Sequence, residues 1–322
     1  MSDQMRFEDL RRVTMVGAGT MGAGMSMCFA QAGYQVSLYS RSSESLDRAL
    51  ARIENSQSLF VQEDLITAAE AVAAKKRITP KTRLEESLEG TQFVLESVPE
   101  DLALKQALFR RIETACSAGT ILATNTSGLS ITAIASACAR PGLVGGMHWA
   151  NPPEIVPLVE VVRGEQTSDN TVDVIYRATE KLGKAPVLIQ KELPGFASNR
   201  LQYAVLREAL HLVAEGVVSA EDVDRTLKNG VGFRYPWLGP LETADLGGLD
   251  VFHNVGQYLF PALNSEAEMP EVFRQLVAEG KFGIKSGEGF FEYGPDDRED
   301  ILRKRDLFFV RQLKAIREIK NQ

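Results

Sequence analysis

The chain of 322 residues is 44% hydrophobic and 25% charged, as expected of a globular protein with two domains and a full core. Its net charge of −7 argues against nucleic acid as a partner, because a phosphate backbone selects basic surfaces. Its three cysteines form no CxxC pair, and neither a signal peptide nor an apolar run of about 18–20 residues is evident. We therefore expect a soluble, cytoplasmic protein with no disulfide framework, no metal site and no membrane contact.

The first part of the chain predicts strands and helices in alternation. A short apolar strand over 12–17 leads into a helix over 20–32 and a second strand over 34–40. Helical periodicity continues over 43–76, which is long enough for two helices. A further helix is predicted over 102–116, and further strands over 92–97, 120–123, 143–147, 155–162 and 187–189. This alternation predicts a Rossmann-type α/β fold, a doubly wound parallel sheet with helices on both faces.

The pattern changes after Pro194-Gly195. From there to the end of the chain, strand signals are almost absent, and amphipathic helical stretches cover 199–215, 220–228 and 298–320. We therefore divide the chain into a dinucleotide-binding domain, residues 1–192, and an all-α C-terminal domain for substrate binding and dimerisation, residues 193–322.

A GxGxxG motif, Gly17-Ala-Gly19-Thr-Met-Gly22, joins the first predicted strand to the first helix. In that position the motif is typical of dinucleotide binding. Gly17 permits the tight turn, Gly19 lets backbone approach a pyrophosphate, and Gly22 allows close packing of helix on strand. Thr20 and Met21 open the helix, whose free N–H groups attract an anion. The alternative is an incidental glycine-rich turn.

The second predicted strand ends in Ser40-Arg41, without the acidic residue that NAD-specific sites place there for the ribose 2′-hydroxyl. An acid would repel a 2′-phosphate, whereas an arginine and hydroxyl groups would bind it. We therefore expect either NAD or NADP as the cofactor, with NADP(H) accepted through Ser40 and Arg41. The alternative is that Arg41 points to solvent and that the cofactor is selected elsewhere.

Of three histidines, His148 stands out as a candidate base. It follows a predicted parallel strand, at the edge where doubly wound sheets bind ligands. Glu160 lies in an otherwise apolar strand, where a carboxylate is costly unless it is paired. A carboxylate bonded to one ring nitrogen would fix the tautomer of a histidine base. The alternative is a structural histidine in the core and an exposed glutamate at an edge.

Two other polar clusters suit a substrate site. Asn125-Thr126-Ser127 follows a predicted strand and so falls on the same edge of the sheet, and Asn199-Arg200 opens the first helix after Pro194-Gly195. Ordinary helix capping would explain either cluster equally well.

Several motifs in a fixed order carry a more specific signal than any one of them. They are VGAGTMG (16–22), ESVPEDLALKQALF (96–109), TNTSGLSI (124–131), GMHWANPPEIVPLVEVV (146–162), PGFASNRL (194–201) and GIKSGEGFFEY (283–293). With these motifs the chain resembles the L-3-hydroxyacyl-CoA dehydrogenase family over essentially its whole length.

The resemblance implies a role for individual residues. It puts the catalytic histidine at His148 and its partner carboxylate at Glu160, with Ser127, Asn151 and Asn199 around the substrate oxygen. It also implies a homodimer formed through the helical C-terminal domain. The residues expected to bind the cofactor are Gly17, Gly19, Thr20, Met21, Gly22, Ser40, Arg41, Pro99, Glu100 and Asn125.

The motifs also depart from the fatty-acid enzymes of that family, which read HFFNPV where this chain reads HWANPP. They are more similar to two branches that use free acids, the gulonate 3-dehydrogenase and lambda-crystallin branch and the dehydrogenases of pyridoxine degradation. Arg234 stands where those branches carry a basic residue, and guanidinium binds a carboxylate through two hydrogen bonds. We expect Arg234 to bind a substrate carboxylate; the alternative is a surface ion pair.

These observations predict an NAD(P)-dependent dehydrogenase that oxidises the hydroxyl group of a small hydroxy acid. Two rival predictions remain open. One is a true 3-hydroxyacyl-CoA dehydrogenase, and the other is a crystallin-like protein that binds the cofactor without turnover.

Overall fold

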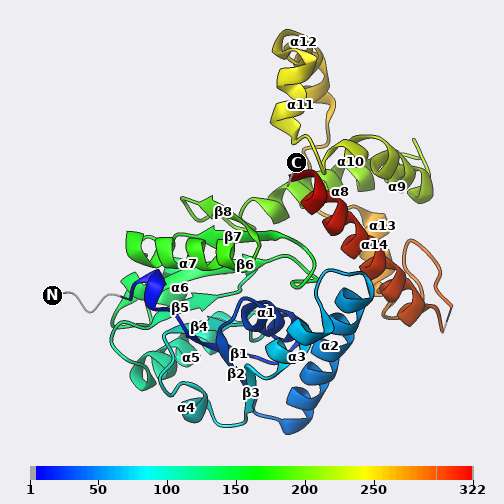
Figure 1. Cartoon of the computed structure of the whole chain (residues 1–322). Coiled ribbons are helices and arrows are strands. Elements are labelled where there is room, and N and C mark those ends of the chain that lie inside the picture. The colour runs from blue at the N-terminus through cyan, green and yellow to red at the C-terminus, as the bar shows by residue number, and fades with distance from the viewer. Residues whose placement is uncertain (1–4, 295, 321–322) are drawn as a thin grey trace. The chain divides into compact units, whose positions relative to one another are not determined.

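The computed structural model describes residues 5–294 and 296–320 and gathers the strands into one eight-stranded sheet (Figure 1). The strand order is β3-β2-β1-β4-β5-β6-β7-β8. Their bounds are β1 (Arg12–Val16), β2 (Gln35–Tyr39), β3 (Ile78–Lys81), β4 (Phe93–Glu96), β5 (Ile121–Thr124), β6 (Val144–Trp149), β7 (Leu158–Val162) and β8 (Ala185–Ile189). The chain moves outward from β1 on one side and from β4 on the other, so the predicted doubly wound Rossmann-type fold is confirmed.

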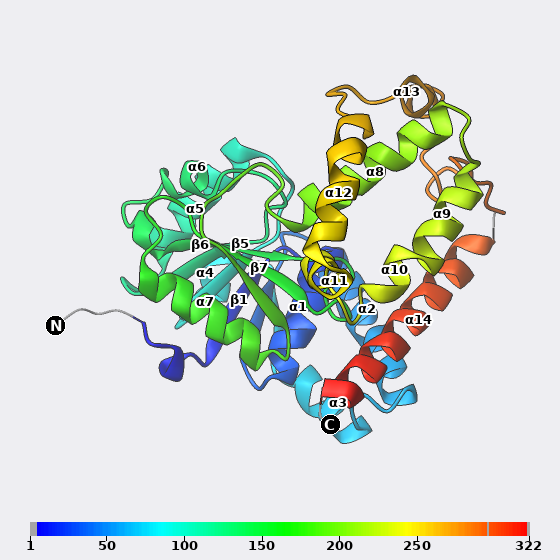
Figure 2. The same ribbon diagram turned by 90° about the horizontal axis from the view of Figure 1, so that it is seen from above.

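Seven helices belong to the sheet's layers: α1 (Thr20–Gln31), α2 (Ser43–Gln62), α3 (Ala68–Lys75), α4 (Leu84–Ser87), α5 (Leu102–Ala115), α6 (Ile131–Ala135) and α7 (Asp169–Lys181). One sheet face, with Met15 and Leu38, packs in the core that α1, α2, α3 and α7 share. The opposite face, with Val16 and Leu122, packs against α4, α5 and α6. Helices therefore cover both faces of the sheet (Figure 2). Functional side chains are expected where the strands end.

The expectation of a wholly parallel sheet is wrong at one pairing, since β7 runs antiparallel to β6. The link between them, residues 150–157, is shorter than the dozen or more residues of a parallel crossover. The chain therefore turns back, and Ile155 and Val156 both donate their N–H groups to Pro152 O instead of extending the strand predicted from 155. In this register His148 lies directly opposite Glu160.

The sequence patterns did not predict β3. Its four residues include Pro80, which cannot donate to a strand ladder and is tolerated because β3 is an edge strand.

The described residues form two compact units. The first takes in the described residues up to Asn199 and from Asp306 onward, and the second takes in those between Arg200 and Arg305. The second unit is helical and contains most of α8 (Ser198–Ala214), then α9 (Ala220–Asn229), α10 (Val231–Arg234), α11 (Pro240–Gly247), α12 (Leu249–Leu259), α13 (Glu271–Ala278) and the start of α14 (Asp297–Lys320).

The predicted division assigned all of 193–322 to one domain, but the end of α14 belongs to the first unit. Val310 is fully buried in the same core as the residues of α1, and Arg311 pairs with Glu63, which directly follows α2. Within 5–294 and 296–320, every helix is too short or too polar to cross a bilayer.

Candidate active site

The turn between β1 and α1 is built by its glycines. Gly17 has φ of 117°, and a Cβ added there would lie 2.4 Å from Ser97 O. A Cβ on Gly22 would lie 1.8 Å from Gly17 O, so only glycine lets α1 start this close to β1. A Cβ on Gly19 would meet nothing within 4 Å. The turn is therefore tight on its inner side and open where Gly19 faces outward.

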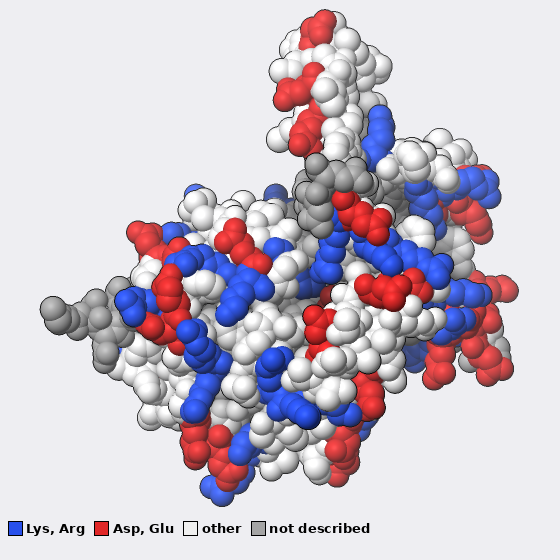
Figure 3. All heavy atoms as spheres, viewed as in Figure 1, with Lys and Arg blue, Asp and Glu red and all other residues white. Residues whose placement is uncertain are grey.

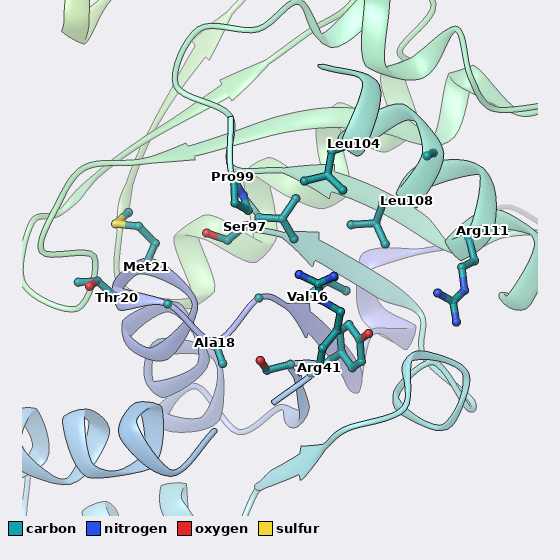
Figure 4. Close-up of a pocket in the computed structure, with 16 residues that line it drawn as sticks. Val16, Ala18, Thr20, Met21, Arg41, Ser97, Pro99, Leu104, Leu108 and Arg111 are labelled. Carbon is teal, nitrogen blue, oxygen red and sulfur yellow. The ribbon is translucent and has the colours of Figure 1, made fainter. Parts of the chain in front are cut away.

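A cavity of about 690 Å³ adjoins this turn (Figure 4). Seven of the residues expected to bind the cofactor line it: Gly17, Gly19, Thr20, Met21, Ser40, Arg41 and Pro99. Residues that the motifs did not indicate complete its wall, among them Tyr39 at the end of β2 and Leu104, Leu108 and Arg111 on α5. Leu104 and Leu108 recur at helical spacing within the ESVPEDLALKQALF motif, and this was the one signal that pointed to them.

The three other expected cofactor residues do not line the cavity. Gly22 packs against the backbone of Gly17 inside the turn. Asn125 accepts a hydrogen bond from Trp149 N at 2.9 Å and donates to Ser97 Oγ at 3.5 Å, so it joins the ends of three strands. Glu100 is bonded to the turn that carries Ser127.

A buried ion pair lies beneath the cavity wall, between Glu96 and Lys105. Both side chains are at most 1% exposed, and Lys105 Nζ lies 2.6 Å from Glu96 Oε1. The same oxygen accepts from Val98 N at 2.5 Å, and Thr124 donates its hydroxyl to the other oxygen at 2.6 Å. With these bonds the pair joins the ends of β4 and β5 to α5 and fixes the loop that carries Pro99. A lysine on a helix surface is usually solvated, so no pattern in the sequence indicated it.

His148 and Glu160, the predicted catalytic pair, are hydrogen-bonded to each other. His148 Nδ1 lies 2.8 Å from Glu160 Oε2, and the two side chains are 8% and 1% exposed. Since an ionised carboxylate can only accept, His148 must donate its Nδ1–H, which leaves Nε2 as the ring nitrogen able to take a proton. This is the arrangement that a histidine base requires.

Glu160 is also bonded to the start of α8. Its Oε1 accepts from Ala197 N and from Ser198 N, both at 2.9 Å, and its Oε2 accepts from Ser198 Oγ at 3.0 Å. Burial acts to raise the pKa of Glu160, but the hydrogen bonds from His148, from the two backbone N–H groups and from the Ser198 hydroxyl outweigh it, so the pKa is lowered. Ser198 was not among the predicted residues, although it precedes Asn199 in the same motif.

Phe196 holds the imidazole from one side. Its ring centroid is 5.5 Å from that of His148, and it is 3% exposed. Phe196 has φ of 49°, a left-handed conformation that is uncommon outside glycine, and it follows Gly195 with φ of 78°. This turn directs the phenyl ring inward while the next two N–H groups reach Glu160.

Ser127 and Asn199 are brought together by a hydrogen bond from Asn199 Nδ2 to Ser127 O at 3.0 Å. Glu100 secures the same turn, since it accepts from the Thr126 hydroxyl, from Ser127 N at 2.9 Å and from Gly128 N at 3.3 Å. Burial acts to raise the pKa of Glu100, but these bonds and the nearby Lys105 lower it overall. Because Asn199 directly follows Ser198 in α8, two hydrogen bonds, Asn199 to Ser127 and Ser198 to Glu160, link Ser127 to the His148–Glu160 pair.

Two other predicted substrate residues, Asn151 and Arg234, take no part in the hydrogen bonds described above. Asn151 is exposed in the link after β6. Arg234 ends α10 in the second unit and is also exposed. The network of the first unit therefore leaves His148 Nε2 as the ring nitrogen able to take up a proton, where β6 ends.

The chain matches two models of one known protein family. A family model for the NAD-binding domain of 3-hydroxyacyl-CoA dehydrogenase matches residues 12–193, and the model for the C-terminal domain of that enzyme matches residues 195–293.

Individual relatives cover nearly the whole chain. A 5-formyl-3-hydroxy-2-methylpyridine 4-carboxylate 5-dehydrogenase of Mesorhizobium japonicum is 34% identical over 96% of this chain and 98% of its own length. An L-carnitine dehydrogenase of Streptomyces griseus is 37% identical over 96% of this chain and 90% of its own. The solved structure of a 5-formyl-3-hydroxy-2-methylpyridine 4-carboxylic acid 5-dehydrogenase, described as NAD⁺-dependent, covers 96% of this chain and 98% of its own at 33% identity, with a TM-score of 0.89.

The lowered pKa of Glu160 predicts how its contribution to stability depends on pH. In Glu160→Gln, one of the two accepting oxygens becomes an NH₂ group that cannot accept the hydrogen bonds made there, and the variant should lose about 2 kcal/mol of unfolding free energy at pH 7. A carboxylate whose pKa falls on folding stabilises fully above its ordinary pKa of 4.5, and the contribution disappears as the pH falls through the lower folded value. Urea unfolding of the wild type and the variant between pH 7 and pH 3 should show the difference shrinking below about pH 4.5.

The matched control is Glu165→Gln, because Glu165 is exposed just after β7. It should leave the unfolding free energy nearly unchanged at every pH. A difference between wild type and Glu160→Gln that stays constant down to pH 3 would contradict this assignment.

Proposed function

Because the chain belongs to the 3-hydroxyacyl-CoA dehydrogenase family, we propose that it oxidises the hydroxyl group of a free hydroxy acid, with His148 as the base. Membership confirms the predicted resemblance and identifies an NAD-dependent oxidoreductase that acts on a CH–OH group. The observation that carries the choice of base is the buried His148–Glu160 pair, whose second ring nitrogen is left to accept a proton.

The glycine turn fits a dinucleotide. Gly19 leaves open space where a pyrophosphate would approach, and the start of α1 supplies N–H groups for it. We assign the pyrophosphate to Gly17, Gly19, Thr20 and Met21, and the adenosine half to Ser40, Arg41 and the apolar wall with Leu104. When bound, the nicotinamide ring supplies the hydride acceptor.

The protein's own groups manage the proton. His148 Nε2 takes the hydroxyl proton of the substrate while Nδ1–H remains bonded to Glu160, which stabilises the imidazolium that forms. We place the substrate oxygen beside Ser127 and Asn199, where polar side chains balance the negative charge that develops on it. Reduction follows the same path in reverse.

The choice of a free acid rests on the relatives and on Arg234. Two relatives that cover 96% of this chain are named for a pyridine carboxylate and for L-carnitine, and neither name contains a CoA thioester. We assign the substrate carboxylate to Arg234, since a guanidinium stays charged and binds a carboxylate through two hydrogen bonds.

A CoA thioester is the second candidate. A probable 3-hydroxybutyryl-CoA dehydrogenase of Bacillus subtilis is 35% identical over 88% of this chain. A non-catalytic role is the third, since a human lambda-crystallin homolog is 33% identical over 91% of the chain. The intact pairing of His148, Glu160 and Ser198 argues against loss of turnover.

We propose that NADP(H) is accepted beside NAD. Ser40 and Arg41 line the cavity at the end of β2, with Arg111 as a second guanidinium on its wall. Arg111 is bonded to Glu85, by its Nε at 2.9 Å, so Arg41 is the better placed to bind a 2′-phosphate.

We also propose a homodimer formed through the second unit. Helices α9 to α13 contain no buried residue, and large apolar side chains are exposed on these helices and on the links between them: Phe233, Trp237, Leu241, Leu246, Tyr258 and Phe260 are between 68% and 81% exposed. In Figure 3, α11 and α12 show mostly uncharged surface. Such apolar exposure is typical of a face that a second copy covers.

A cytoplasmic location is proposed from the three free cysteines.

The central prediction concerns His148→Gln. This variant should lose at least about 10³-fold in kcat while its affinity for NADH stays within about twofold, because the base is removed and the dinucleotide cavity is untouched. The assay is a screen of free hydroxy acids and hydroxyacyl-CoAs with both cofactors, followed by absorbance of the reduced nicotinamide. His253→Gln is the control and should keep full activity. Turnover of acetoacetyl-CoA with no turnover of any free acid would select the CoA candidate.

Arg234→Ala should raise KM for the free acid by roughly 10- to 100-fold, since a charge-assisted pair of hydrogen bonds is lost. Arg225→Ala, on the exposed face of α9, removes an arginine that pairs with Asp222 and should leave KM unchanged. An unchanged KM in Arg234→Ala contradicts the carboxylate assignment.

Arg41→Ala should lower kcat/KM for NADP by about tenfold and leave that for NAD nearly unchanged, because only NADP carries the 2′-phosphate. Arg48→Ala, one to two turns along α2, serves as the control. A strong preference for NAD in the wild type that persists in Arg41→Ala refutes the proposal.

A further inference from the structure

Arg52 on α2 reaches the first residue of α1. Its guanidinium donates to Thr20 Oγ1 at 2.7 Å, across 32 residues of sequence. Thr20 lines the dinucleotide cavity and is labelled at the start of α1 in Figure 4. Both side chains belong to exposed residues, so solvent or a ligand can reach the pair. No motif in the sequence indicated Arg52.

A cation is poorly placed at this point. The N-terminus of a helix carries a partial positive charge, which favours anions and disfavours cations within the first turn. The first turn of α1 contains no acidic residue, and its N-cap, Gly19, has no side chain to cap it. Nothing in the described part of α1 therefore offsets the charge of Arg52.

The bonding of Arg52 also differs from that of several other arginines in the described part of the chain. Arg111 is bonded to Glu85, Arg311 to Glu63 and Arg177 to Glu8. Among the described residues, the recorded bond of Arg52 is to a neutral hydroxyl. Glu54, two positions along α2, is bonded to Lys75 on α3 instead.

An anion on the turn would reverse this unfavourable balance. Gly19 leaves open space on the outer side of the turn, and the Thr20 hydroxyl accepts from Arg52 while keeping its own hydrogen to donate. A pyrophosphate seated there would meet the N–H groups of α1, the Thr20 hydroxyl and a guanidinium within one hydrogen-bond length of that hydroxyl.

We propose that Arg52 is a binding residue for the pyrophosphate of the dinucleotide, held in place by Thr20 until the cofactor arrives. The guanidinium then donates to a phosphate oxygen, and its charge offsets part of the double negative charge of the pyrophosphate. This assignment uses only the dinucleotide-binding turn and is independent of the substrate and of the 2′-phosphate.

The test is calorimetric binding of ADP-ribose, which carries the pyrophosphate but neither nicotinamide nor a 2′-phosphate. Arg52→Met should weaken ADP-ribose binding by about 3- to 10-fold at low salt, and the loss should shrink at about 0.3 M salt, where exposed charges are screened. Arg48→Met is the matched control, because Arg48 is an exposed arginine of the same helix bonded to Ser45. It should leave the Kd unchanged.

Heat stability without ligand separates binding from a structural role. Ligand-free Arg52→Met should melt no lower than the wild type, since a cation leaves the positive end of α1, and it should gain less in Tm from ADP-ribose. Arg52→Gln provides the same comparison if the methionine variant is poorly folded. Equal ADP-ribose affinity in wild type and Arg52 variants, or an equal loss in Arg48→Met, overturns the proposal, whereas the oxidation of hydroxy acids would be tested independently by turnover.

Discussion

The carboxylate of Glu160 is the group on which the candidate site depends. It is nearly fully buried and accepts hydrogen bonds from His148 Nδ1, from two backbone N–H groups at the start of α8 and from the Ser198 hydroxyl. A buried charge is tolerated only when it is compensated in this way. The same bonds that keep Glu160 ionised also orient the imidazole and fix the first turn of α8, where Asn199 approaches Ser127. Local stability, the tautomer of His148 and the position of Asn199 thus all depend on this one carboxylate.

The interaction between His148 and Glu160 arises from the antiparallel pairing of β6 and β7. Because residues 150–157 are too few for a crossover, β7 returns antiparallel to β6 and places Glu160 opposite His148 at the carboxyl edge. The dinucleotide turn ends β1, two strands away from β5 and its Asn125-Thr126-Ser127 turn. The proton-accepting group and the glycine turn therefore both lie at the carboxyl edge of the sheet, which is where doubly wound sheets bind ligands.

Local patterns predicted much of this. The bounds of β1, α1 and β2 were predicted to within a residue or two, because hydrophobic periodicity and glycine positions are local properties of the sequence. The direction of β7 was not predicted, since strand pairing depends on the length of the preceding link and not on the composition of the strand. The burial of Lys105 depends on Glu96, which reaches it only after β4 and α5 have packed. Helices α10 to α13 were not predicted, because they are only 4 to 11 residues long and a glycine or proline precedes each of them, which interrupts the helical pattern.

The tautomer of His148 tests the central claim most directly. In protein labelled with ¹⁵N at histidine, NMR of the neutral imidazole should show a proton on Nδ1 and none on Nε2, because Glu160 can only accept. The preference should weaken in Glu160→Gln. A neutral His148 that carries its proton on Nε2 in the wild type would contradict the account, since that nitrogen could not then take the proton of a substrate.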